Sequence, residues 1–176
     1  GHHAVEADAM GFCFFNNVAV AAVHLLATDR AERVAVLDWD VHHANGTQEI
    51  FYDREDVLVI SLHNDHDSWS AETHPQACDR SERGVGDGTG YTVNVPLPAG
   101  TGNDGYRYAM QELVDPVLDA YGPDALLVSA GQDPGVVDPL GRNAVTKDGF
   151  EFLGRRAREL AADVTLLDGL AQPVDE

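Results

Sequence analysis

The feature that most constrains this chain is an abrupt change of character between residues 34 and 48. An apolar run at residues 34–37 gives way to Asp38, Asp40 and His42, and then to an Asn-Gly pair at 45–46. This pattern predicts a buried strand that opens into a loop at its C-terminal end, where open α/β sheets hold their sites. Because side chains alternate along an extended chain, we expect Asp38, Asp40 and His42 on one face. Two carboxylates and an imidazole supply half of a divalent-metal site.

Apolar and amphipathic segments alternate along the rest of the chain, which predicts a single α/β domain over residues 1–176 with a largely parallel sheet covered on both faces. Further strands are predicted at residues 57–62, 91–97, 125–130 and 164–167, and helices at about 16–26, 104–121 and 148–160. Pro116 is expected to bend the second helix. Asp148 and Glu151 are interpreted as a capping box at the start of the third.

Asp133 supplies the ligand that the first cluster lacks. It follows the predicted strand at 125–130, as Asp40 and His42 follow theirs, so the three are expected to meet on one rim of the sheet. Two carboxylates and one imidazole leave coordination positions open, which is typical of a catalytic metal. His2 and His3 are candidates for proton transfer beside it.

Less specific interpretations of the same residues stay open. The DxDxH stretch could form hydrogen bonds without a metal, although Asp133 favours metal binding. His43, His63 and His66 are interpreted as structural or surface residues, because no third ligand pairs with them.

Charge and cysteine content restrict the partners. The chain has 30 Asp and Glu against 11 Lys and Arg, a formal net charge of −19. Nucleic acid and anionic membrane surfaces are therefore poor partners for the chain as a whole, whereas cationic substrates such as acylated lysines or polyamines are favoured electrostatically. Acidity that serves only solubility is the alternative, and net charge bears on solubility more directly than on any one site. Cys13 and Cys78 form no disulfide or metal pattern, and no segment is apolar enough to span a membrane, so the expected location is cytoplasmic.

Six linked motifs occur in a fixed order: GHHA at 1–4, GFCFFNN at 11–17, DWDVHHANGTQ at 38–48, NVPLP at 94–98, SAGQD at 129–133 and DPLG at 138–141. This order resembles the histone deacetylase and acetylpolyamine amidohydrolase superfamily, above all its class II, prokaryotic deacetylase-like branch. The resemblance implies a three-layer α/β/α fold of the arginase and deacetylase type. It also implies a zinc-dependent amidohydrolase, with Fe²⁺ as the alternative ion, that removes acetyl or acyl groups from acetylated lysine or acetylpolyamine. Oligomer formation is left open.

The resemblance also implies roles by position. Asp40, His42 and Asp133 match the zinc ligands. The catalytic set is matched by His3 as general base and acid, His2 as its electrostatic companion, and the orienting partners Asp38 and Asn45. A structural potassium site is matched by Asp38, Asp40, His42, Ser61 and Leu62, and the substrate tunnel by Gly11, Phe12 and His74.

Three departures from the family pattern qualify this interpretation. His74 stands where a tunnel aromatic is usual, and Ala44 stands where glycine is usual. The family's catalytic tyrosine has no match; its nearest counterpart is the DGLA stretch at 168–171. Such an oxyanion donor is often worth about 3–4 kcal/mol. The family's chains are also longer, so we expect this one to be the central portion of the domain, incomplete at both ends.

These departures leave three alternatives to a deacetylase. One is a pseudo-deacetylase that binds metal and acyl-amine ligand without turnover. The second is an arginase-like dimetal hydrolase, and the third is a truncated product that does not fold and exposes sheet edges.

Overall fold

A parallel sheet forms the centre of the computed structural model, which describes residues 1–65 and 79–161. Its strand order is β3-β2-β1-β4, and all three neighbouring pairs are parallel. The strands are β1 (Val34–Asp38), β2 (Val57–Asn64), β3 (Thr92–Leu97) and β4 (Ala125–Ser129). The four corresponding predictions are confirmed to within two residues at either end, whereas the predicted strand at 164–167 lies outside the described residues.

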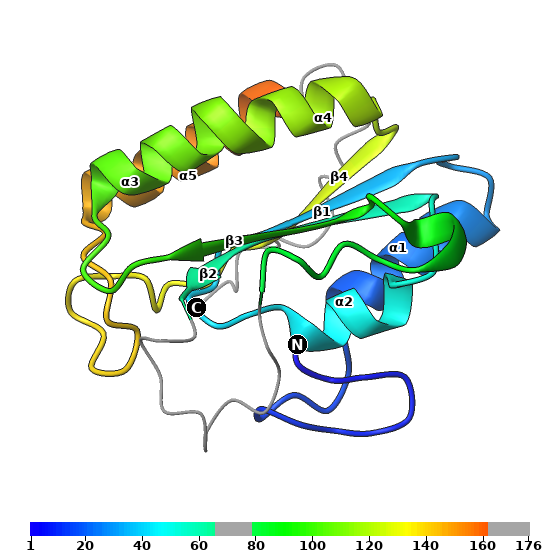
Figure 1. Ribbon diagram of the computed structural model, residues 1–176, viewed down its shortest axis with the longest axis horizontal. Coiled ribbons are helices and arrows are strands. Elements are labelled where there is room, and N and C mark those ends of the chain that lie inside the picture. Colours follow the sequence, from blue (N-terminus) through cyan, green and yellow to red (C-terminus); the bar gives the residue numbers. More distant parts are fainter. Residues whose placement is uncertain (66–78, 162–176) are drawn as a thin grey trace, which may run out of the picture.

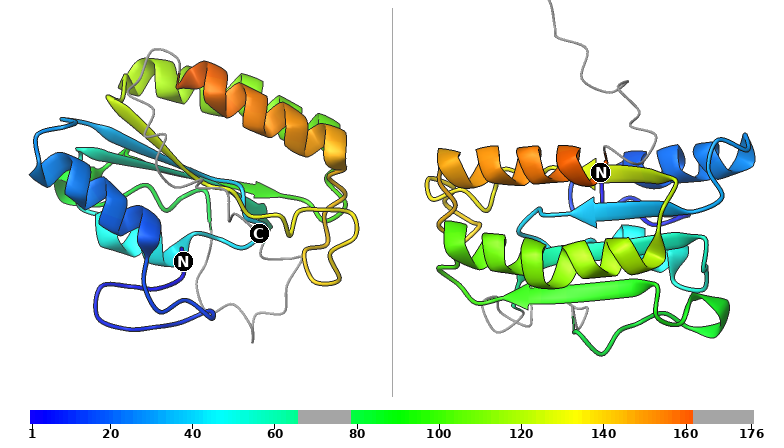
Figure 2. Two further views of the ribbon diagram at one scale, coloured as in Figure 1. Left: turned by 180° about the vertical axis from the view of Figure 1, so that it is seen from behind. Right: turned by 90° about the horizontal axis from the view of Figure 1, so that it is seen from above.

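Helices cover both faces of the sheet, so the predicted three-layer α/β/α arrangement is present (Figure 1). One face carries α1 (Asn17–Ala27) and α2 (Asn45–Phe51); the other carries α3 (Asn103–Ala109), the π-helical segment η3 (Met110–Val114), α4 (Asp115–Tyr121) and α5 (Lys147–Leu160). Figure 2 shows that α5 and the continuous helical run of α3, η3 and α4 lie side by side over the strands. A short 3-10 turn, η2 (Gly86–Gly88), precedes β3. Among the described residues, no helix combines the length and apolar character needed to cross a bilayer.

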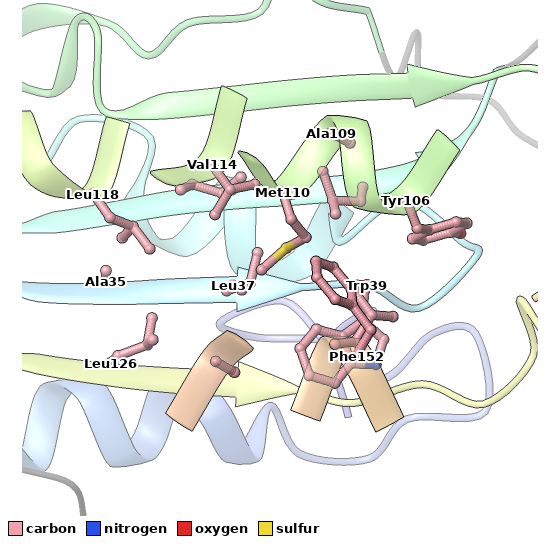
Figure 3. Packing of buried hydrophobic residues seen from close by; sticks show 14 of the residues in the cluster. Ala35, Leu37, Trp39, Tyr106, Ala109, Met110, Val114, Leu118, Leu126 and Phe152 are labelled. Atoms are coloured by element: carbon pink, nitrogen blue, oxygen red, sulfur yellow. The ribbon is translucent and has the colours of Figure 1, made fainter. Parts of the chain in front are cut away.

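The core follows from the alternation of side chains along the strands. Every residue of β1 and β2 is buried, as expected for a parallel sheet covered on both sides. Val34 and Val36 pack into the cluster beneath α1, while Ala35 and Leu37 pack into the cluster beneath α3, α4 and α5. Figure 3 shows Leu37 below Met110 in the second cluster. Since the alternation continues, Asp38 belongs to the α1 face at the end of β1.

Two of the helices show local details that bear on the sequence predictions. The helix at 104–121 departs from α geometry at η3, before Pro116, because proline lacks an N–H and its ring crowds the preceding turn. The capping box at Asp148 is wrong, because α5 has Thr146 as its N-cap residue and places Asp148 in the first turn. The Thr146 hydroxyl accepts from the Asn103 amide instead of capping the helix.

The Asn-Gly pair at 45–46, interpreted as the end of the motif in a loop, begins α2. Ala44 lies just before it with φ −75°, so its Cβ causes no strain there. The position therefore does not need the backbone freedom of the glycine that is usual in the family.

Candidate metal centre

The candidate site lies between β1 and β4, where the order in which strands are added to the sheet switches from one side of β1 to the other. The chain adds β2 and β3 on one side of β1 and then crosses to add β4 on the other. Such a change of side in the strand order is the place where open α/β sheets hold their sites, at the C-terminal ends of the strands. Asp38 is paired in register with Ser129, and the Trp39 N–H donates to the Ser129 carbonyl at 3.2 Å. The loops that follow β1 and β4 thus start side by side.

Asp40, His42 and Asp133 meet at this edge of the sheet, as the sequence predicts. One ligand atom from each lies within 4.8 Å of the others. His42 Nδ1 is 3.0 Å from Asp40 Oδ1 and 2.7 Å from Asp133 Oδ2. Backbone donors fix both carboxylates: the His42 N–H donates to Asp40 Oδ1 and the Val41 N–H donates to Asp133 Oδ1, each at 2.9 Å. The three side chains are 19–23% exposed, so the cluster is open on one side.

The two carboxylates of this cluster favour a bound cation or proton. Burial and the neighbouring Asp40 carboxylate raise the pKa of Asp133. Burial also disfavours the imidazolium of His42, but its hydrogen bonds to Asp133 and Asp40 outweigh this and raise the pKa of His42 to about 9. A proton on His42 therefore neutralises part of the carboxylate charge. Two carboxylate oxygens and one imidazole nitrogen are also the donor set of a catalytic divalent ion, so the residues fit such a metal.

His2 and His3 lie beside the cluster and have different partners. His2 Nδ1 is 2.8 Å from Asp38 Oδ2, and its Nε2 is 3.6 Å from Asp40 Oδ1. His3 Nδ1 is 2.5 Å from Asn45 Oδ1. The two histidine rings are 4.1 Å apart between centroids, and the ring of His3 lies 5.9 Å from that of His42.

These partners give the two imidazoles opposite properties. Although burial opposes charge, the hydrogen bond to Asp38 raises the pKa of His2. Burial and the charge of His2 lower the pKa of His3 to about 4, despite its hydrogen bond to Asn45. At neutral pH, His3 is thus a neutral base beside a histidine that is more readily protonated.

Several glycines allow the loops to approach this closely. A Cβ on Gly131 would lie 2.6 Å from Asp40 Oδ2, and a Cβ on Gly11, whose φ is +56°, would lie 2.4 Å from His3 Cδ2. Gly46 lies against the backbone of His3 and Ala4 at the start of α2. No role was assigned to Gly131 or Gly46 from the sequence alone. Their position close to Asp133 and Asn45 in the sequence is the only feature that could have indicated close packing at the site.

Of the remaining predicted site residues, the structure describes Phe12 and Ser61 near the side chains already named. Phe12 follows Gly11 in the same turn with φ +64° and is fully exposed. Ser61 is buried and paired in register with Asp38, and its hydroxyl accepts from the Ala44 N–H at 3.3 Å. His74 lies outside the described residues. A cavity of about 370 Å³ adjoins His2 and Asp40 between α1 and the end of β4.

The other histidines behave differently from the ligand candidates. His43 and His63 are buried with their rings 4.7 Å apart. His43 Nε2 is within hydrogen-bonding distance of Gln48 and Asn94 side-chain oxygens, and His63 Nδ1 is 3.0 Å from the Ser61 hydroxyl. These contacts support a structural role for both, as predicted.

Comparison with known proteins finds a family model and several similar proteins that match most of this chain. A family model described as "Histone deacetylase domain" matches residues 1–169. The chain is 45% identical over 163 residues to histone deacetylase 8 of Arabidopsis thaliana, covering 93% of this chain and 43% of that protein. It is 45% identical over 161 residues to the histone deacetylase-like amidohydrolase of Pseudomonas aeruginosa, covering 92% and 41%.

Among solved structures, the crystal structure of an acetylpolyamine aminohydrolase from Burkholderia pseudomallei is similar, with a TM-score of 0.83 and 42% identity. The match covers 94% of this chain and 46% of that one. The chain therefore spans less than half the length of the relatives it matches.

Proposed function

Because this chain belongs to the histone deacetylase domain family, whose members are hydrolytic deacetylases, we propose that it carries the metal centre of a zinc-dependent amidohydrolase acting on an acetylated or acylated amine. The observation that carries the proposal is the convergence of Asp40, His42 and Asp133 within 4.8 Å, next to the neutral imidazole of His3. When bound, a divalent ion would act as a Lewis acid toward the acyl carbonyl and supply acidified water. Zinc fits the donor set, and Fe²⁺ is the alternative.

His3 is proposed as the group that moves protons. Its Nδ1 is engaged by Asn45, so Nε2 is the nitrogen left for the reaction. There it accepts a proton from the attacking water and afterwards delivers it to the nitrogen of the departing amine as the C–N bond breaks. The low pKa of His3 supports the accepting step, because the imidazole is neutral before the reaction.

His2 and Asp38 are proposed to assist electrostatically. The buried Asp38 carboxylate orients His2 and favours its protonated form. A positive charge on His2, close to His3 and Asp40, would stabilise negative charge that develops on the acyl oxygen.

A structural potassium ion is proposed beside Asp38. Asp38 and Ser61 are neighbours in the sheet and both are buried, which supports a cation among oxygen atoms of Asp38, Asp40, His42, Ser61 and Leu62. Gly11 and Phe12 are proposed as tunnel residues because their turn packs against His3. His74 is retained as a tunnel candidate on sequence grounds alone.

The proposed substrates are acetylated lysine and acetylpolyamines, in line with the net charge of −19, which attracts cations. A pseudo-deacetylase is the second candidate, favoured by the lack of a residue matching the catalytic tyrosine. Tyr106 does not replace it, because its side chain is fully buried and its hydroxyl is bonded to Asn143.

The test combines metal analysis with hydrolysis of an acetyl-lysine peptide and of N-acetylputrescine by the purified chain. We expect one ion per chain, lost in His42→Ala and in Asp133→Ala; wild-type metal content in either variant would contradict the ligand assignment. His3→Ala should keep the metal and lose any turnover. Metal binding without turnover in the unmodified chain would indicate either a pseudo-deacetylase or an active site that needs parts of the longer family domain.

A further inference from the structure

We propose that Met10 is a positioning residue for this site: its thioether sulfur holds the side-chain amide of Asn45 in the orientation that presents the amide oxygen to His3. The sulfur accepts a hydrogen bond from Asn45 Nδ2 at 3.3 Å, while Asn45 Oδ1 lies 2.5 Å from His3 Nδ1. Met10, Asn45 and His3 thus form a chain of contacts that ends at the proposed base. The effect on turnover rests on the proposed function, whereas the orientation itself does not.

The orientation matters because the two ends of an amide are chemically opposite. An amide oxygen only accepts hydrogen bonds, so Oδ1 requires the proton of a neutral His3 to sit on Nδ1 and leaves a lone pair on Nε2. A rotated amide would present its NH₂ group to Nδ1, which would then have to accept and would place the proton on Nε2. In that tautomer His3 cannot take a proton from water at Nε2.

The sulfur contact can influence the orientation of the Asn45 amide because Asn45 is buried. Asn45 is 7% exposed, so water has little access to its NH₂ group, and a buried donor without an acceptor is unfavourable. A thioether is a weak acceptor, but it favours one amide orientation over the other where few alternatives exist.

The turn that carries Met10 is itself fixed against the site. Met10 and Cys13 form an antiparallel bridge, and the Cys13 N–H donates to the Met10 carbonyl at 2.8 Å. Gly11, at the tip of this turn, packs so closely on the His3 ring that no side chain would fit. The same turn therefore contacts His3 directly through Gly11 and indirectly through Met10 and Asn45.

The experiment measures the tautomer of His3 by ¹⁵N NMR of the histidine-labelled chain, with the His3 signals identified by their loss in His3→Ala. Met10→Leu removes the sulfur but keeps an apolar side chain at a position that is 37% exposed, so the fold should tolerate it. Met10→Gln restores an acceptor on a side chain of similar length. Met110→Leu, at the only other methionine, is the matched control.

We expect Nδ1–H to predominate in the wild type and in Met110→Leu, to give way to a mixture of tautomers in Met10→Leu, and to be restored in Met10→Gln. In an active preparation, kcat of Met10→Leu should fall by up to about tenfold, the size of one neutral hydrogen bond, with little change in KM. An unchanged tautomer in Met10→Leu would overturn the proposal. Equal mixtures in Met10→Leu and Met10→Gln would also overturn it, because packing would then be the cause. A chain that binds metal without turnover would leave the NMR test intact.

Discussion

Metal binding at Asp40, His42 and Asp133 should compete with a proton, and this competition can be measured. The pKa of His42 is about 9 in the metal-free protein, because its Nδ1 faces two carboxylates. At a pH of about 7, therefore, roughly one chain in 100 has the neutral imidazole that a metal requires. Displacing the proton lowers the apparent affinity about 100-fold, or roughly 3 kcal/mol.

The apparent affinity should then rise about tenfold per pH unit between roughly pH 6.5 and 8.5 and level off near 9. Isothermal titration of Zn²⁺ into the metal-free chain, in two buffers of different ionisation enthalpy, should show about one proton released per ion near neutral pH. His3→Ala is the control, because it keeps all three ligands and should release the same proton. An affinity that does not depend on pH, with no proton released, would refute this account of His42.

The same pKa predicts how the stability of the metal-free chain varies with pH. Because the folded-state pKa of His42 lies above the ordinary 6.5, its contribution is fully present below about pH 6.5 and is lost as the pH rises through about 9. The loss should not exceed roughly 3–4 kcal/mol, because the pKa of His42 lies about 2.5 units above its ordinary value. Urea unfolding at several pH values would measure it, and Asp133→Asn should flatten the profile, since it removes one of the carboxylates that favour the imidazolium.

Two further predictions concern close packing and a partly buried ion pair. Gly131→Ala should lower metal affinity at least about tenfold, because its Cβ would lie 2.6 Å from Asp40 Oδ2, whereas Gly154→Ala, in open space on α5, should keep the affinity and stabilise the chain by about 0.5–1 kcal/mol. Equal affinities in the two variants would contradict the packing argument. Arg156→Met should lower the free energy of unfolding by about 1–3 kcal/mol, because Nε and Nη2 both donate to Asp115 Oδ2. Arg155→Met, on the exposed side of α5, should change it by less than about 0.5 kcal/mol, and comparable losses in both would show that the Asp115 pair adds nothing.

The sheet and the ligand cluster could be predicted because burial and strand ends leave a local signal. β1 is apolar up to Leu37 and β2 up to Ile60, and Asp40, His42 and Asp133 each lie within four residues of the end of a strand. Parallel strands bring such ends to one edge whatever their distance in sequence. The strand order could not be derived in this way, because it depends on which strands pair, and that is decided by packing between distant segments.

Local capping and contact partners were harder to predict. An Asn-Gly pair favours a turn, yet Asn45 begins α2, where the Thr47 N–H donates to the His2 carbonyl at 3.1 Å. Asp148 resembles an N-cap residue, but the preceding Thr146 takes that position. Met10 carries no chemical signature at all, and only its 3.3 Å contact with Asn45 gives it a role. For Asn45 and Met10, the deciding contact joins residues that are far apart in the sequence, so the local sequence does not reveal it.

The attachment of the N-terminal residues explains why motifs far apart in the sequence serve one site. His2 and His3 belong to no helix or strand, so their positions depend on hydrogen bonds to other elements. The buried Asn16 provides them: its Nδ2 donates to the Ala4 carbonyl and to the Thr47 hydroxyl, both at 3.1 Å, while its Oδ1 accepts from the Ala19 N–H and caps α1. A single side chain thus joins the histidine segment to both helices on that face of the sheet. The first motif can place its imidazoles only when the second and third are folded against it, which is why the three are expected to be effective together and not separately.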